Sequence, residues 1–197
     1  MSTAIQRIKD RLTKANIQRN TESSRQWLYR NARRIVTSAS ISQLRSESRL
    51  VSRPVPGHMY MYLYDPKGKD TLEFYDRFPL VFVVKYYKDG FLGLNLHYLQ
   101  PIYRMRLFEM LLTFQSDTRY NEKTRLEITY RKLMAVSRSD FAKPCLKRYL
   151  YSQLDTKFIQ VPADEWELAL FIPFERFKHK NRAYDKRDVW ANSASLL

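Results

Sequence analysis

The positions of the helix-breaking residues constrain this fold most, because all eight prolines and all four glycines lie at or after Pro54. The first 53 residues contain neither, so helices are the natural conformation there. Apolar residues in this segment recur at intervals of three and four, the spacing of one helix face, at Ile5, Ile8, Leu12 and Ala15 and again at Leu28, Ala32, Ile35 and Ala39. Short isolated helices are marginal in water. We therefore expect a basic helical arm over residues 1–53 whose helices need a partner surface or an anion to form.

The clearest boundary in the chain runs from Arg53 to Gly57, where two prolines stand two residues apart and favour extended backbone. Beyond it, three apolar runs bounded by turn residues predict strands. These strands are expected over residues 58–64, 79–85 and 91–97. The Asp89-Gly90 pair between the last two is the strongest short signal for a β-hairpin. The run at 79–85 is almost continuously apolar, which indicates a strand covered on both faces.

The rest of the chain mixes helical and extended patterns. Helices are predicted over 102–114, after Asn121 as an N-cap, and after Pro144 through Leu150. Two more strands are predicted over 157–161 and 166–172, and the segment from Phe177 predicts a loose tail. The sum is an α+β fold with a small antiparallel or mixed sheet and packed helices. Its expected divisions are the arm at 1–53, a globular domain at 54–176 and a basic polar tail at 177–197.

Charge is the strongest compositional signal: 35 Lys and Arg face 20 Asp and Glu, giving a formal net charge of +15. Residues 1–53 alone hold 12 basic and three acidic residues. So dense a positive segment is typical of proteins that release counterions from a phosphate backbone, although an anionic membrane or acidic protein would also suit it. The expected DNA-binding residues are Arg7, Arg11, Lys14, Arg19, Arg25, Arg30, Arg33, Arg34, Lys147, Arg148, Lys178, Lys180, Arg182 and Trp190.

Several classes of protein are disfavoured by what the sequence lacks. No stretch approaches the roughly 18 consecutive apolar residues of a membrane helix, and we expect no secretory signal. Cys145 is the only cysteine, so neither a disulfide framework nor a cysteine-rich zinc site is expected. The three histidines have no nucleophile motif to serve as a base for. The sequence also contains no glycine-rich phosphate-binding loop. We predict no cofactor, no metal site and no catalytic residue, and we interpret His97 as a packed structural histidine.

One acidic group leads to a separate hypothesis, because clustered carboxylates hold Mg²⁺ in nucleases. The group consists of Asp65, Asp70, Glu73 and Asp76. We interpret Asp65 as a turn residue that bonds its own backbone, and Asp76 as the charge partner of Arg77. A metal-dependent nuclease remains a minor alternative.

Aromatic residues are abundant, with 14 Tyr, 11 Phe and 3 Trp. Most are expected in the core, since aromatic side chains bury large areas. Tyr60, Tyr62 and Tyr64 share one face of the first predicted strand, which indicates either a stacking platform for bases or an assembly surface. Trp190, alone among basic residues, is the other candidate for stacking on an exposed base pair.

Several short segments have distinctive amino-acid sequences. They are Tyr62-Leu-Tyr-Asp-Pro-Lys-Gly-Lys-Asp-Thr-Leu72, Tyr75-Asp-Arg-Phe-Pro-Leu-Val81 and Asp89-Gly-Phe-Leu-Gly-Leu-Asn-Leu-His-Tyr-Leu99. Shorter ones follow at Lys147-Arg-Tyr-Leu150, Ala163-Asp-Glu-Trp166 and Val189-Trp190. On these residues the chain resembles the DNA end protector family of large contractile-tailed phages, the myoviruses. These segments contain no catalytic motif, so they indicate a family relationship rather than a mechanism.

The resemblance implies a non-enzymatic virion protein, assembled in the host cytoplasm and placed at the end of the packaged genome. It would bind double-stranded DNA or DNA ends, shield the end from host exonuclease, and help complete the head for tail joining. Other phage structural proteins are expected partners, and a homo-oligomer in a virion ring is a further expectation. A structural component of the neck, tail or baseplate without DNA binding has the same basic, cysteine-poor composition and is the alternative.

Overall fold

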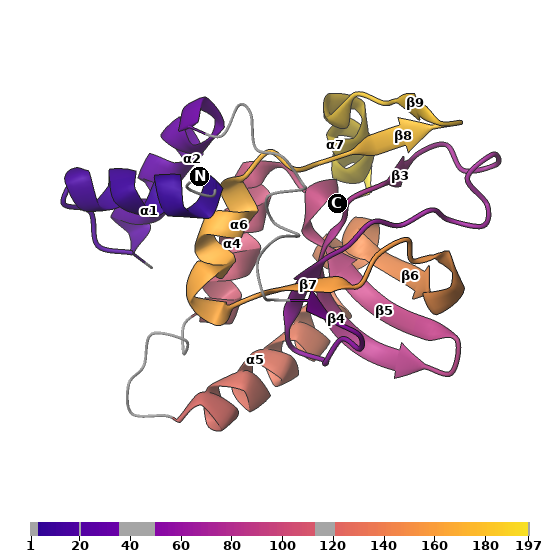
Figure 1. Cartoon of the computed structure of the whole chain (residues 1–197), viewed down its shortest axis with the longest axis horizontal. Helices are drawn as coiled ribbons and strands as arrows, with labels where there is room; N and C mark the ends of the chain where they lie inside the picture. Colours follow the sequence, from indigo (N-terminus) through magenta and orange to yellow (C-terminus); the bar gives the residue numbers. More distant parts are fainter. Residues whose placement is uncertain (1–3, 20, 36–49, 113–120, 197) are drawn as a thin grey trace.

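Two antiparallel sheets organise the chain in the computed structural model, which describes residues 4–19, 21–35, 50–112 and 121–196 (Figure 1). The main sheet has six strands in the order β1-β7-β2-β4-β5-β6. In chain order they are β1 (Leu50–Val51), β2 (Met59–Met61), β4 (Leu80–Tyr87), β5 (Gly90–Asn95), β6 (Leu146–Leu150) and β7 (Phe158–Val161). The second sheet, ordered β3-β8-β9, is made of β3 (Tyr75–Asp76), β8 (Phe177–His179) and β9 (Arg182–Ala183). The predicted α+β class is therefore confirmed.

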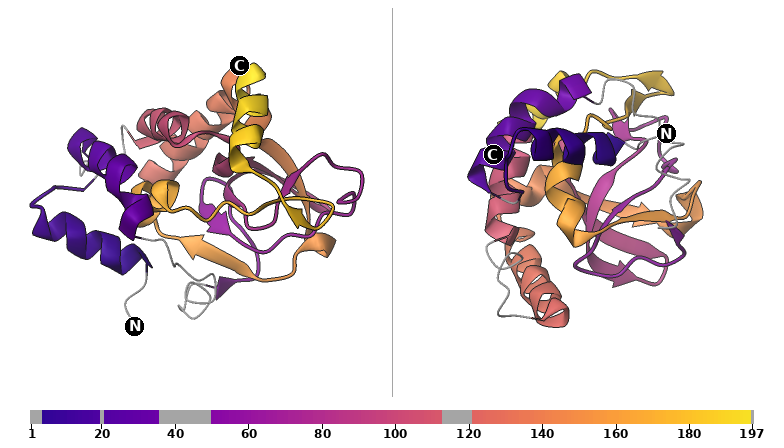
Figure 2. Two further views of the ribbon diagram at one scale, coloured as in Figure 1. Left: turned by 90° about the horizontal axis from the view of Figure 1, so that it is seen from above. Right: turned by 60° about the vertical axis from the view of Figure 1, so that its left-hand side comes forward.

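The helices gather on one side of the main sheet. They are α1 (Ala4–Lys14), α2 (Glu22–Ile35), α4 (Pro101–Leu112), α5 (Glu122–Val136), α6 (Trp166–Phe171) and α7 (Lys186–Ser195). Figures 1 and 2 show α1 and α2 together at one end of the molecule, with α4 and α6 between them and the strands. Within the described residues, no helix is long and apolar enough to span a membrane.

The main sheet curls around an aromatic cluster on the face away from these helices. The cluster contains Tyr60, Tyr62, Tyr64, Phe91, Tyr149 and Phe158, each at most 6% exposed. The rings of Phe91 in β5 and Phe158 in β7 lie 5.7 Å apart, although two strands separate them. Three strand spacings would place them roughly 14 Å apart in a flat sheet. The curvature therefore encloses these rings in a core of their own.

The N-terminal helices pack against the body of the protein. Ile8 and Leu12 of α1 and Leu28 and Ala32 of α2 are at most 1% exposed and belong to the same core as the residues of α6. These four positions of the predicted stripes are buried as expected, whereas Ala15, the last position of the first stripe, is exposed. Their partner surface is α6, which contacts both helices. The side chains of Ile5 and Ile35, and all of Ala39, lie outside what the structure describes.

The predicted hairpin and the cap at Asn121 are confirmed. Leu80–Tyr87 and Gly90–Asn95 pair as adjacent antiparallel strands, and Leu80 to Val84 are all buried. Asn121 accepts a hydrogen bond from the amide of Thr124 at 2.9 Å and begins α5.

Three predictions of local structure are wrong. The segment after Pro144 is strand β6 and not a helix, because it pairs along its length with β5. The segment 166–172 contains helix α6, and the residues Trp166–Phe171 are all buried. An apolar run this short does not distinguish a buried helix from a buried strand. The tail is ordered: Asp185 caps α7 by accepting from the amide of Arg187 at 2.8 Å.

Candidate functional site

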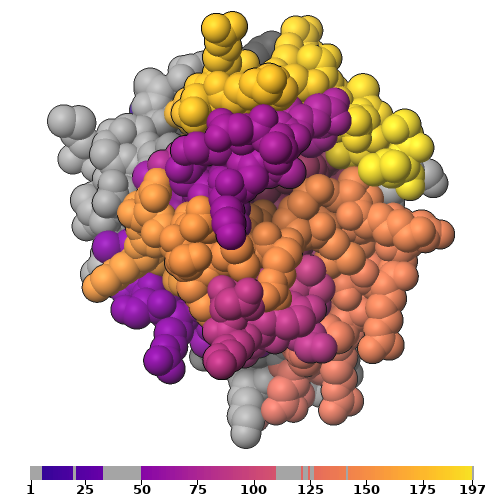
Figure 3. Space-filling view, turned by 90° about the vertical axis from the view of Figure 1, so that its right-hand side faces the viewer, coloured from indigo at the N-terminus to yellow at the C-terminus, as the bar shows by residue number. Residues whose placement is uncertain are grey.

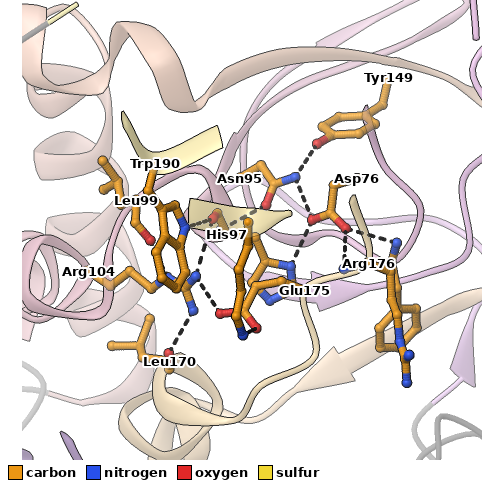
Figure 4. Close-up of polar contacts among 12 residues, drawn as sticks. Asp76, Asn95, His97, Leu99, Arg104, Tyr149, Leu170, Glu175, Arg176 and Trp190 are labelled. Atoms are coloured by element: carbon orange, nitrogen blue, oxygen red, sulfur yellow. Dashed lines mark hydrogen bonds and ion pairs between the residues drawn. The ribbon is translucent and has the colours of Figure 1, made fainter. Parts of the chain in front are cut away.

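A buried polar network joins the two sheets (Figure 4). Asp76 of β3 accepts hydrogen bonds from the amides of Phe78 and Arg176 and from the side-chain amide of Asn95. Nδ1 of His97 lies 2.8 Å from Oδ2 of the same carboxylate. His97 is fully buried and Asp76 is 3% exposed. The prediction that His97 is a packed structural histidine is therefore confirmed.

Arg104 of α4 is the centre of a second group of buried contacts. Its guanidinium donates to the carbonyl oxygens of Leu99, Leu170 and His97 at 2.8, 3.1 and 3.2 Å. It also forms an ion pair of 2.6 Å with Glu175, whose other oxygen lies 3.2 Å from Lys186 of α7. Burial alone would raise the pKa of Glu175, but the positive charges, Arg104 first, hold that pKa well below its ordinary value.

These two groups of contacts fix the fold and leave no reacting group open to solvent. A histidine beside a carboxylate is the arrangement of a general base, but a base must reach the proton that it removes. Here the pair is enclosed, and it ties β3, β5 and the C-terminal helix together through Trp190, whose Nε1 donates to the carbonyl of His97 at 2.9 Å. Sequence reasoning missed Arg104 and Glu175, because no local motif marks a buried ion pair.

The acidic group takes a different arrangement from the one that was predicted. Asp76 does not pair with Arg77: burial turns its carboxylate toward His97, and Arg77 forms its ion pair with Asp155 instead. Asp65 lies 2.8 Å from Lys69. Among the described residues, no three His, Cys, Asp or Glu side chains are grouped so as to hold a metal ion.

The predicted DNA-binding residues of the arm divide into two sets. Arg19 bonds to Asp164, and Arg25 lies 3.1 Å from Glu109, so both guanidinium groups face carboxylates of the body. Arg11, Lys14 and Arg30 are exposed, and Arg7 is half-buried. Arg33 and Arg34 lie in α2, and their side chains are outside the described set. Pairing with the body therefore removes Arg19 and Arg25 from the free positive surface.

The predicted residues of the tail meet on the β8–β9 hairpin. Lys180 and Asn181 have φ values of 42° and 66°, the left-handed backbone at both turn positions that a two-residue type I′ turn requires. Lys180 and Arg182 are exposed and Lys178 is half-buried. Nothing in the described part of the chain forms an ion pair with these three cations. We call Lys178, Lys180 and Arg182 the basic hairpin.

Lys147 and Arg148 point to opposite sides of β6. The ammonium of Lys147 lies 4.1 Å from the ring centroid of Tyr98, and burial lowers its pKa. Arg148 is exposed, forms an ion pair with Asp89, and covers the ring of Tyr87 at 3.8 Å from its centroid. Lys147 is therefore turned onto an aromatic ring, whereas Arg148 is exposed but already faces a carboxylate, as Arg19 and Arg25 do.

The predicted stacking residues are not on the surface. Tyr60, Tyr62 and Tyr64 are at most 6% exposed because the sheet curls around them, and Trp190 is 7% exposed because α7 packs on the core. The expectation of an exposed Trp190 in a loose tail is wrong. The exposed tyrosines among the described residues are Tyr29, Tyr86, Tyr87 and Tyr151. Tyr86 and Tyr87 directly precede the predicted hairpin turn, so their position at the end of the sheet could have been read from the sequence.

Comparison with known proteins identifies the family of the chain. No curated protein and no solved structure matches the chain. The family model described as the phage T4 terminal DNA protecting protein matches residues 3–193, which is nearly the whole of the 197-residue chain. The chain therefore belongs to the family of phage T4 terminal DNA protecting proteins, virion proteins that protect the ends of phage DNA.

Proposed function

We propose that this protein binds the end of the packaged genome without cleaving it, shields that end from host exonuclease, and helps complete the head for tail joining. The single observation that carries the proposal is the family match over residues 3–193. The free cations of the basic hairpin support it, because Lys and Arg without acidic partners neutralise phosphates most effectively. Assembly in the host cytoplasm and contacts with other virion proteins, including further copies of this chain in a ring, belong to the same proposal.

The first prediction separates protection of ends from coating of DNA. Phosphate contacts carry no positional information, so a merely basic surface would bind linear and circular duplexes alike. We expect the protein to slow a double-strand exonuclease on a linear duplex at concentrations at which a closed circle of equal length competes poorly. The measurement is the rate of nucleotide release with and without the circle. If the circle competes fully and digestion is not slowed, a structural role in the neck, tail or baseplate replaces this proposal.

The second prediction concerns the basic hairpin. Changing Lys178, Lys180 and Arg182 together to Gln should weaken binding to any duplex, because these side chains would no longer neutralise phosphates. The slope of log affinity against log salt concentration should flatten by about 0.9 for each phosphate that is no longer neutralised. The measurement is a titration at several salt concentrations.

A matched variant removes the same charge elsewhere. Arg131, Arg138 and Lys143 are exposed at the end of α5 and in the segment after it, and changing all three to Gln lowers the net charge equally. This variant should keep the salt slope of the unmodified protein. An equal loss in both variants would show that total charge, rather than the hairpin, drives binding. The exposed arm residues Arg11, Lys14 and Arg30 can be compared in the same way.

A further inference from the structure

Three of the four exposed tyrosines among the described residues lie around the end of the β4–β5 hairpin. Tyr86, Tyr87 and Tyr151 are 44%, 41% and 37% exposed. We call these three residues the tyrosine patch. Tyr86 and Tyr87 are the last residues of β4, and Tyr151 follows β6, which pairs with β5. Exposed rings grouped in this way are unusual on a surface that gains nothing from them, since burying an aromatic ring is strongly favourable.

A bulge in β4 sets the direction of these rings. Val83 pairs with Gly93 but Lys85 pairs with Leu92, so β4 carries one extra residue at this point. A bulge turns the residues that follow it to the opposite faces of the sheet. Tyr86 therefore lies on the face of its partner Phe91, and Tyr87 lies on the face that carries Arg148. The two rings cover both sides of the hairpin end.

Close contacts hold the patch in place before any ligand arrives. A Cβ added at Gly90 would meet the carbonyl oxygen of Tyr149 at 1.9 Å, so glycine is what allows β5 and β6 to approach here. The ring of Tyr151 rests 5.9 Å from that of Phe91, and the hydroxyl of Tyr86 donates to the carbonyl of Pro54. Rings that are already fixed lose little conformational entropy on binding.

Cations surround the patch. The ring of Tyr87 has the guanidinium of Arg148 over it and the ammonium of Lys85 at 5.5 Å from its centroid. Burial raises the pKa of Tyr151, and the positive charges of Arg53 and Arg148 oppose that rise. Lys88 is exposed in the turn, where Asp89 pairs with Arg148. The local charge is therefore positive.

We propose that the end of the β4–β5 hairpin abuts the terminal base pair of a duplex, with Tyr86 and Tyr151 contacting it from one side of the sheet and Tyr87 from the other, while the surrounding cations contact its last phosphates. A terminal base pair is the one part of a duplex that exposes a flat π-face, and phosphates border it. Figure 3 shows the β4–β5 hairpin and the β8–β9 hairpin on one face of the molecule, separated by the segments near residues 65–75 and 151–157. The same duplex would then meet the basic hairpin through its backbone. This inference rests on the proposed function and adds a binding site for the end itself.

The chemistry of the patch favours DNA over a protein partner. Tyrosine and arginine are common in both kinds of interface, but lysine is depleted in protein–protein interfaces. Lys85 and Lys88 flank the rings here, and neither forms an ion pair within the described residues. Stacking of a base on an aromatic ring tolerates any sequence. That tolerance suits the end of a genome better than it suits a specific protein surface.

The test compares two duplexes of equal length, one with open blunt ends and one closed at both ends by hairpin loops. The unmodified protein should prefer the open duplex and should slow exonuclease digestion of it. The Tyr87→Ala, Tyr151→Ala double variant should lose that preference by about fivefold or more, the factor that corresponds to the lower bound of about 1 kcal/mol for one base–ring stack. Its affinity for the closed duplex should stay the same, because the basic hairpin is intact.

Three further variants make the result specific. Phe at both positions keeps the rings and should keep the preference. Leu at both positions keeps the apolar bulk without a ring and should lose it, which covers the case of a poorly folded alanine variant. Tyr29→Ala removes an exposed tyrosine from α2, at the other end of the molecule, and should change nothing.

The outcomes distinguish the patch from the proposed function. If the unmodified protein neither prefers open ends nor slows the exonuclease, the proposed function itself fails. A second outcome is that the unmodified protein prefers open ends and slows the exonuclease while the alanine and leucine variants do the same to an equal extent. The ends are then protected by another surface, and the proposal for the tyrosine patch is overturned. A double variant that protects ends but no longer enters particles would also overturn it, since the patch would then bind a virion protein.

Discussion

Replacing Arg104 by methionine will lower the free energy of unfolding by about 3–5 kcal/mol, the range for removing one partner of a buried ion pair. Methionine fills much of the same volume but donates no hydrogen bond. The carbonyl oxygens of Leu99, Leu170 and His97 would each lose a donor, and Glu175 would lose its nearest cation. The measurement is urea unfolding followed by circular dichroism.

The control lies one half-turn away on the same helix. Arg106 is exposed on α4, so Arg106→Met should change the free energy of unfolding by no more than about 0.5 kcal/mol. If both substitutions lowered the free energy of unfolding equally, the buried contacts of Arg104 would contribute no more to stability than the contacts of an exposed arginine.

The loss at Arg104 should depend on pH. In the unmodified protein the pKa of Glu175 is held below its ordinary value, so its contribution is present above about pH 4.3 and fades as the pH falls toward the lowered pKa. Without Arg104, burial becomes the dominant influence and raises that pKa above the value in the unfolded chain. The variant then regains stability as the pH falls through the raised pKa. The difference between the two proteins should therefore be larger at pH 8 than at pH 5.

Local signals were sufficient where one short segment determines the structure. Asp89-Gly90 predicted the β4–β5 hairpin, and Asn121 predicted the start of α5, because turn and cap chemistry acts within a few residues. The segments that became α6 and β6 were assigned wrongly, because packing and strand pairing with distant residues decided them. Nothing near Leu146 in the sequence indicates that β5 will pair with it.

The same distinction applies to the candidate site. Net charge correctly indicated a basic surface, but the sequence could not tell which cations the fold would neutralise. Arg25 faces Glu109, 84 positions later in the chain, whereas Lys180 meets no acidic side chain among the described residues. Trp190 was misplaced for a related reason: a lone aromatic among charges resembles a surface residue until the helix that carries it is seen packed on the core.

The status of the N-terminal helices can be decided by one buried leucine. Leu28 of α2 is fully buried in the core that includes Leu168 of α6. Leu28→Ala should lower the free energy of unfolding of the whole protein by about 2–5 kcal/mol, because it leaves a cavity that the helices cannot fully close. If α1 and α2 are integral, circular dichroism and tryptophan fluorescence will report a single transition with a lower midpoint.

The neighbouring residue supplies the control, since Tyr29 is 51% exposed and Tyr29→Ala should change the unfolding free energy by at most about 0.5 kcal/mol. An arm that folds separately would behave differently: Leu28→Ala would leave the main transition where it was. That outcome would favour residues 1–53 as an arm that folds separately from the globular domain. A shifted single transition would mean that deleting the arm damages the fold. The role of the arm in DNA binding must then be tested by changing exposed residues such as Arg11 and Lys14 one at a time.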